Sequence, residues 1–573
     1  MELDHIRDPA KVPGHEVFQV RSELPDAPLY HCCELHCLQD LVRGIKMRRV
    51  SVAVRMLLFC VVIGCGGRQG LPEYTGIADT LDQQARLGVT PENNAAARLC
   101  EVVELYQDSY RVKLRERLEF HRRIGVPAAG SETPRLQNFA KFEWEFRDLE
   151  QVLSQIDVRF QLPEFFHEGL PAAGPVRADM SRLHLDSVAW TARQHPLAAS
   201  WVRSQEPVLQ VIRDAAARSH WYLPIIASKG DSGSVDTVMW RTEFHGNMTE
   251  VFEILRMAAM LRLGEQQVQA AWTELRALLR LSRHLQSESD VGFLTGLSVE
   301  SVASARCLEL LSLPNLSEAD IDGFLADLQA LPAPGDPLLH AEQYGRPVMF
   351  ELLEFLRRDE RQRLAVLTDP LADNEADRRL EQVLRKHSDI DWTAVERRVS
   401  EEYDRWQQRF QSGDLPQAIQ SMREAVDQWE HLLSAAKSAL ETGKSTSRET
   451  VAEYVTFRML VMGPAEIQYL QRFALGTRIQ RSLLLTSCWL RKYQLRTGDW
   501  PETPGAVEQL FGCRLPADPM HGAALGYRRV GSAIRLYSVG KNGSDDGGER
   551  NSDDVVHRQP FMSVRAARLP SAP

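Results

Sequence analysis

The sequence has no excess of positive charge, no long apolar run near its start and no recognisable catalytic motif. Its 573 residues carry a formal net charge of -10. This charge argues against a general nucleic-acid binder, because such proteins displace phosphate counterions with basic patches. The apolar run from Met56 to Ile63 is shorter than the ~20 apolar residues that a membrane-spanning helix needs. The sequence therefore favours neither a nucleic-acid partner nor a transmembrane helix at this point.

Motifs for nucleotide binding and catalysis are also missing, since we find no phosphate-cradling glycine loop, dinucleotide fingerprint or nucleophile elbow. The segment "GDSGS" (230–234) resembles the nucleophile segment of chymotrypsin-like proteases, but helical patterns surround it where that fold needs strands. The segment "FHEG" (166–169) starts like a zinc-protease helix and lacks the second histidine four residues after His167. We therefore expect a protein that is not an enzyme.

What is present is the composition of a folded protein, with 43% hydrophobic and 25% charged residues. Single hydrophobic cores stop growing near ~250–300 residues, so two or more domains are expected.

The first strong signal begins at Met47, with "MRRVSVAVRMLLFCVVIGC". A positive cluster followed by an apolar run is the order found in secretory signal peptides. The run ends in "VIGC", which resembles the lipobox of bacterial lipoproteins. In that family the cysteine is acylated and the peptide before it is removed. The resemblance implies that Cys65 is lipidated, and that the protein lies in the bacterial cell envelope, anchored to the membrane and facing outside the cytoplasm. A chance apolar stretch in a cytoplasmic protein is the alternative.

The residues before Met47 do not fit this interpretation, because no signal peptide is expected to begin so far inside a chain. The simplest account is that translation starts at Met47, so that residues 1–46 are not translated or are disordered. The segment "HCCELHC" (31–37) lies there, and the adjacent Cys32 and Cys33 cannot easily take two corners of a tetrahedral zinc site.

Cysteine is too sparse beyond the leader for a disulfide framework. The cysteines concerned are Cys65, Cys100, Cys307, Cys488 and Cys513. Two alternatives are compatible with the sequence. Cys488 and Cys513 form one disulfide bridge in an oxidising compartment, or the cysteines are buried thiols that act as small apolar side chains.

Residues 91–463 are predicted to form a large multi-helix body, loosely like a solenoid, so the fold class is mainly α. Apolar side chains recur there at three- and four-residue steps, which places them on one helix face. One such face comprises Val268, Trp272, Leu275 and Leu279. Ser317 and Asp320 have the spacing of a capping box, and the prolines of 331–337 predict a loop. Charged runs such as 357–363 are interpreted as solvated helix faces with internal ion pairs.

The C-terminal part has a different pattern. A helix is predicted from Ala465 to Arg496, with Gly498 as its left-handed cap. Two strand-like stretches follow, at 524–530 and 533–539, joined by a short turn. This is a small α+β module, predicted to span 464–557.

The residues of this module resemble the C-terminal part of the major pseudopilin of type II secretion systems. The matching positions are Tyr493, Gly498, Trp500, Pro501, Pro516, Asp518, Pro519, Gly522, Tyr527, the run from Leu536 to Gly540, Asn542, Gly543, Gly547, Gly548, Asp553 and Asp554. The resemblance implies nothing about the helical body. A true pseudopilin begins with an apolar helix that enters the filament core. This chain instead has a lipobox-like start and a long helical body before the module. Ordinary assembly into a filament is therefore doubtful for this chain.

In the pseudopilins the acidic loop holds a calcium ion. Carried over, the backbone carbonyl of Val539, the side chain of Asn542 and the carboxylates of Asp553 and Asp554 are the implied ligands. Oxygen ligands of these kinds suit calcium. An EF-hand-like register is a second interpretation, and an acidic loop without an ion is a third. The second register uses Asn542, Ser544, Asp546, Gly547 and Asp553.

Taken together, the sequence predicts a lipid-anchored bacterial envelope protein, non-enzymatic, with a helical interaction scaffold and a calcium-stabilised pseudopilin-like module. A type II secretion or pilus-associated component and an envelope enzyme with an unrecognised active site are the alternatives. The expected partner is the membrane, through the N-terminal lipid; no nucleic acid is expected, and no protein partner is identified. The predicted segments are 1–46, a signal peptide and lipobox at 47–65, a tether at 66–90, the body at 91–463, the module at 464–557 and a disordered tail at 558–573.

Overall fold

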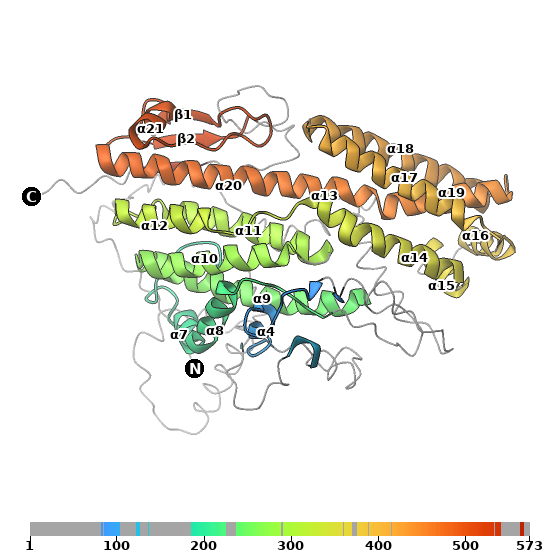
Figure 1. Ribbon diagram of the computed structural model, residues 1–573, viewed down its shortest axis with the longest axis horizontal. Coiled ribbons are helices and arrows are strands. Elements are labelled where there is room, and N and C mark those ends of the chain that lie inside the picture. The colour runs from blue at the N-terminus through green and yellow to red at the C-terminus, as the bar shows by residue number, and fades with distance from the viewer. Residues whose placement is uncertain are drawn as a thin grey trace, which may run out of the picture. The chain divides into compact units, whose positions relative to one another are not determined.

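The computed structural model shows a mainly helical protein with a small antiparallel sheet near the C-terminus (Figure 1). Every residue that the structure describes belongs to one compact unit within Ser51–Pro573. The described residues are 82–83, 85–103, 122–125, 136, 185–224, 237–287, 290–358, 360–368, 375–387, 389–413, 415–531, 533–539 and 562–565. The prediction of a mainly helical chain with a small C-terminal sheet is confirmed.

The elements follow one another as a long series of helices before the strands. The helices are α4 (Ala95–Leu99), α7 (Pro196–Ser204), α8 (Glu206–Ala217), α9 (Thr237–Gly264), α10 (Val268–Leu285), α11 (Asp290–Leu310), α12 (Glu318–Gln329), α13 (Pro337–His340), the π-helix η4 (Ala341–Gly345), α14 (Arg346–Arg358), α15 (Glu360–Leu367), α16 (Glu375–Lys386), α17 (Trp392–Gln411), α18 (Leu415–Glu441), α19 (Arg448–Met462), α20 (Ala465–Thr497) and α21 (Pro504–Phe511). The strands are β1 (Gly526–Val530), β2 (Ala533–Tyr537) and β3 (Met562–Arg565).

Helix α10 lies between α9 and α11 and contributes a large part of the core. The predicted apolar face is confirmed: Val268, Trp272, Leu275 and Leu279 are all buried. Gly296 lets α11 approach α10 closely, because a Cβ atom at this position would lie 2.5 Å from the carbonyl oxygen of Ser282.

The predicted helix start at Ser317 is confirmed as a capping box. The Asp320 N–H donates to the Ser317 hydroxyl at 3.1 Å, and the Ser317 N–H donates to the Asp320 carboxylate at 2.9 Å. These bonds satisfy backbone donors that a helix N-terminus leaves without partners. The segment before α13 is irregular, as its prolines predicted.

One prediction about the charged run at 357–363 is wrong, because Arg363 is buried. Its guanidinium lies 5.6 Å from the centre of the Trp392 ring, and its Nε donates to the carbonyl of Leu356 at 3.0 Å. An arginine can be buried in this way when its apolar stem and flat cation pack on an aromatic ring. Arg358 does follow the prediction, since it is partly exposed and pairs with Glu354 at 2.6 Å.

Helix α20 ends as predicted, with Gly498 in the left-handed conformation at φ 84°. Along its length α20 contacts α11, α12, α18 and α19, and it also contacts α21 and β2 (Figure 1). The helix therefore belongs structurally to the helical body as well as to the C-terminal sheet. The domain boundaries stay a prediction.

The predicted hairpin is confirmed by the antiparallel pairing of β1 with β2, which runs from Gly526 opposite Tyr537 to Val530 opposite Ala533. Strand β3 pairs with the other edge of β2, so that the sheet order is β1-β2-β3. This pairing differs from the expectation of a disordered tail at 558–573. An edge strand offers unpaired backbone groups to a later segment, which periodicity within that segment does not reveal.

The cysteines that the structure describes are free thiols, namely Cys100, Cys307, Cys488 and Cys513. The bridge between Cys488 and Cys513 is therefore not formed. Cys100, Cys307 and Cys488 are buried, in line with the alternative of thiols acting as small apolar side chains. In the part of the chain that the structure describes, none of the helices has the length and apolar character required to cross a membrane.

Candidate functional site

The predicted calcium ligands fall at the edge of the described chain. Val539 follows β2 and is described, whereas Asn542, Asp553 and Asp554 lie outside the described residues. Cys65 and the segments 166–169 and 230–234 lie outside them as well. Within the described residues, no three acidic, histidine or cysteine side chains lie close enough together to hold a metal ion.

Asp518 fixes the position of Val539, where the predicted loop begins. Its side chain is buried, with an exposed fraction of 0%. One carboxylate oxygen accepts the Val539 N–H at 3.2 Å, and the other accepts the Met520 N–H at 2.9 Å. A carboxylate that accepts two backbone N–H groups in the interior ties two chain segments together. Asp518 therefore fixes the chain at the point where the predicted loop begins.

The turn around Asp518 is closed by its backbone as well. The Asp518 N–H donates to the carbonyl of Ala523 at 2.7 Å, and the Gly522 N–H donates to the carbonyl of Asp518 at 2.8 Å. Gly522 takes a positive φ of 72°, which a residue with a side chain rarely adopts. The "DPMHG" segment is thus a compact turn whose glycine and aspartate both have structural roles.

Other residues that carry the pseudopilin resemblance hold the hairpin against the end of α20. Trp500 is buried, and the hydroxyl of Tyr527 on β1 donates to the carbonyl of Pro501 at 2.6 Å. Burial raises the pKa of Tyr527 to about 12, so the hydroxyl keeps its proton at neutral pH. Arg529, also on β1, pairs with Asp499 at 2.6 Å and with Glu502 at 3.1 Å. The contacts of Tyr527 and Arg529 together hold β1 against the segment that follows α20.

A cluster of aromatic and positive side chains joins α20 to α21 and α12, and the sequence did not reveal it. The Trp489 and Phe511 rings lie 5.5 Å apart, and the Lys492 ammonium lies 4.8 Å from the centre of the Phe511 ring. Lys492 also pairs with Asp322 of α12 at 2.5 Å, and Arg496 pairs with Glu318. Cation–π contacts and ion pairs of this kind anchor one helix to another.

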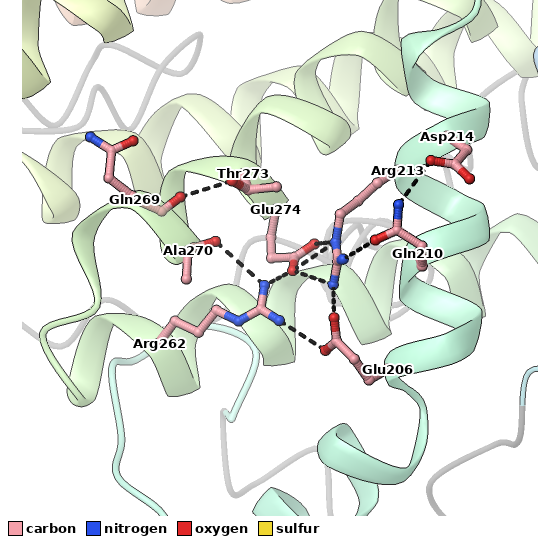
Figure 2. Close-up of polar contacts among 9 residues, drawn as sticks. All are labelled: Glu206, Gln210, Arg213, Asp214, Arg262, Gln269, Ala270, Thr273 and Glu274. Carbon is pink, nitrogen blue, oxygen red and sulfur yellow. Dashed lines mark hydrogen bonds and ion pairs between the residues drawn. The ribbon is translucent and has the colours of Figure 1, made fainter.

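A second cluster missed from the sequence lies where α8, α9 and α10 meet (Figure 2). Glu274 of α10 is fully buried and accepts from Arg213 Nε at 3.2 Å, and it also pairs with Arg262 of α9. Glu206 of α8 completes the cluster by pairing with Arg213 at 2.5 Å and with Arg262 at 3.0 Å. Gln210 extends it by accepting from Arg213 at 2.9 Å.

The charges of this cluster balance, since two arginines face two glutamates. Burial lowers the pKa of Arg262, while Glu206 acts in the opposite direction. A balanced and mutually hydrogen-bonded set leaves little charge to recruit a ligand, so we assign it the role of holding three helices together. Its sequence signal was Glu274, which lies three residues after Ala271 and four before Leu278 on an otherwise apolar face.

Comparison with family models found no match, and comparisons with curated proteins and with solved structures found no significant similarity.

Proposed function

We propose that the protein is a lipid-anchored component of the bacterial cell envelope, without enzymatic activity, whose helical body presents surfaces to other proteins. Its C-terminal module is stabilised by calcium bound in the acidic segment after β2. The observation that carries the calcium proposal is the antiparallel pairing of β2 with β3, in which Leu536 lies opposite Met562.

This pairing matters because of the residues between the two strands. Antiparallel neighbours must be joined by a connection that reverses the chain direction. Asn542, Asp553 and Asp554 all belong to that connection. Crowded carboxylates repel one another unless a cation or solvent separates them, and calcium accepts carboxylate, amide and main-chain oxygens together.

The tie between Asp518 and Val539 supports the same proposal. It fixes the backbone at the start of the connection, next to the carbonyl group that the resemblance gives as a ligand. A ligand on a fixed strand end loses less conformational freedom when an ion binds than a ligand on an unrestrained segment.

Thermal unfolding of the full-length protein tests the calcium site. After treatment with a chelator, millimolar calcium is expected to raise the melting temperature, because a ligand of the native state stabilises it by mass action. The double variant Asp553→Asn and Asp554→Asn should lose this rise. Asp545→Asn is the matched control, since the resemblance assigns it no ligand role, and it should keep the rise.

The variant Asp546→Asn separates the two possible ligand sets. Asp546 is a ligand only in the EF-hand-like register. If Asp546→Asn loses the calcium response and Asp554→Asn keeps it, the ligands are those of the EF-hand-like register and not those of the pseudopilin-like register. An unchanged melting curve on adding calcium to the original chain would remove the site altogether.

The lipid anchor has its own test, which uses two cysteines of the same leader. Cells grown with a labelled fatty acid should label the original chain and the Cys60→Ser variant, and should not label Cys65→Ser. The anchor at Cys65 would be contradicted if all three proteins were labelled equally, or if none of the three were labelled.

A role in type II secretion or with pili is the second candidate function. The observation that favours it is that Trp500, Asp518 and Tyr527, which carry the pseudopilin resemblance, also hold the module together. A pull-down with the full-length chain from native envelopes should then recover pseudopilins, and recovery of none would count against this role.

A further inference from the structure

A small cavity lies among α10, α11, α20 and the irregular segment before α13, apart from the acidic segment considered above. Its lining includes Arg283, Glu300, Gly335, Thr477, Arg478 and Arg481. Its volume is about 10 Å³. That is close to the smallest cavity that holds one water-sized group.

Glu300 within this lining already has partners for both carboxylate oxygens. Arg283 Nη2 donates to one oxygen, and Gln286 Nε2 donates to the other at 2.7 Å. The oxygen of the Gln286 side chain accepts the Gly335 N–H at 2.9 Å. Glu300 thus neutralises Arg283 and has little capacity left for a second cation.

Arg283 is the group left incomplete. Its side chain is 1% exposed, and its Nε and Nη1 have no hydrogen-bond partner in the part of the chain that the structure describes. A buried donor without an acceptor is unfavourable, and its usual explanation in a native protein is a bound water or ion. The cavity beside Arg283 is the place where such a group would lie.

Charge distinguishes an anion from a water. Three arginines and one glutamate line the cavity, so its surroundings carry excess positive charge. Arg481 donates one N–H to the carbonyl of Leu328 at 3.2 Å, which is a neutral acceptor. Burial lowers the pKa of Arg283 to about 10, Glu300 opposes this, and Arg481 and Arg478 add to the lowering. Arg283 is therefore still a cation at neutral pH.

We propose that this cavity binds a small monovalent anion such as chloride. The anion accepts the Nε and Nη1 protons of Arg283 and neutralises part of the charge of Arg478 and Arg481. Since Arg283 belongs to α10 and the other two arginines belong to α20, the anion links these two helices. This site is independent of calcium and of the lipid anchor.

The test is thermal unfolding of the full-length protein in a buffer whose only anion is gluconate, which is too large for the cavity. Replacing gluconate with chloride or bromide at constant ionic strength should raise the melting temperature in a saturable way, because the anion binds the native state alone. The constant ionic strength removes general screening from the comparison.

Variants at the cavity and away from it test whether the chloride effect arises at this cavity. Arg478→Gln combined with Arg481→Gln should weaken the apparent chloride affinity by roughly tenfold or more, as expected for the loss of charge-assisted contacts. Arg472→Gln, a half-buried arginine of the same helix outside the lining, should leave that affinity unchanged. These variants are preferred to Arg283→Met, which would leave the buried Glu300 without its cationic partner and would destabilise the fold.

Two results would overturn the proposal. One is a melting temperature that does not depend on chloride or that depends on it without saturation. The other is an equal chloride response in the original chain and the Arg478→Gln, Arg481→Gln protein. Crystals soaked in bromide give a direct check, because an anomalous peak is expected within hydrogen-bond distance of Arg283 Nε, and a water there without bromide would contradict the anion.

Discussion

The carboxylate of Asp518 accepts the backbone N–H of Val539 at 3.2 Å, although the two residues are 21 positions apart in the sequence. The bond joins the turn after α21 to the end of β2. Asp518 is fully buried, while Val539 is half-buried.

Replacing Asp518 is therefore expected to destabilise the C-terminal module. Asp518→Ala leaves the N–H groups of Val539 and Met520 without acceptors, and each buried unsatisfied group costs about 1–3 kcal/mol. Urea unfolding measures the loss. Glu502→Gln is the control, because its side chain is 86% exposed and it should change the free energy of unfolding far less. Equal losses in the two variants would contradict the structural role of Asp518.

The cluster around Glu274 leads to a second prediction. Glu274→Gln leaves Arg213 and Arg262 facing only Glu206, which is half exposed. Breaking a buried ion pair by removing one partner typically costs about 3–5 kcal/mol. Asp214→Asn alters a partly exposed carboxylate on α8 next to the cluster, where ion pairs are worth about 1 kcal/mol or less. Chemical denaturation of the two variants should separate them clearly, and a small effect of Glu274→Gln would show that the cluster does not hold the helices.

His284 gives a prediction about pH. It is buried, its ring stacks at 6.0 Å on Trp221, and burial holds its pKa at about 4, below the ordinary value of 6.5. The folded protein therefore keeps His284 neutral while the unfolded chain binds a proton below pH 6.5. The contribution of His284 to stability is complete above pH 6.5 and is lost as the pH falls toward 4. The shift corresponds to at most about 3 kcal/mol.

Free energies of unfolding measured from neutral pH downward check this sign. Carboxylates also titrate on the way to low pH, so the comparison is with His284→Phe, which keeps an aromatic ring and does not titrate. The variant should lose less stability than the original chain over the same pH range. Parallel pH curves for the two proteins would show that His284 is not responsible.

The four described cysteines should differ in reactivity. Burial raises the pKa of Cys307 and raises that of Cys488 to about 12, so neither presents a thiolate to solvent. Cys513 is partly exposed. A maleimide reagent followed by mass spectrometry should modify Cys513 in the native protein, and Cys100, Cys307 and Cys488 only after unfolding. If Cys488 and Cys513 became reactive only after reduction, they would be bridged in the native protein.

Features that depend on neighbouring residues were predictable from the sequence. The capping box at Ser317 and the left-handed cap at Gly498 were both predicted, because side-chain and backbone chemistry within one turn decides them. The hairpin between β1 and β2 was predicted for the same reason.

Features that depend on distant partners were not predictable in this way. Arg363 has the local surroundings of an exposed residue, and its burial depends on Trp392. Arg213 meets Glu274 across 61 positions of the chain. The cavity beside Arg283 depends on the packing of α11 against both α10 and α20, which no local pattern specifies. The calcium ligands other than Val539 stay a prediction.

Because α20 is one unbroken helix, the direction in which one end presents its side chains fixes that direction at the other end. Its first half faces α18 and α19, while its second half faces α12, α21 and β2 (Figure 1). Each residue of an α-helix turns the chain by about 100°, so inserting one alanine near its midpoint would rotate the whole C-terminal sheet by that angle about the helix axis. An insertion of four residues returns to within about 40° of the original phase. The number of residues in α20 therefore sets the orientation of the C-terminal sheet relative to the helical body.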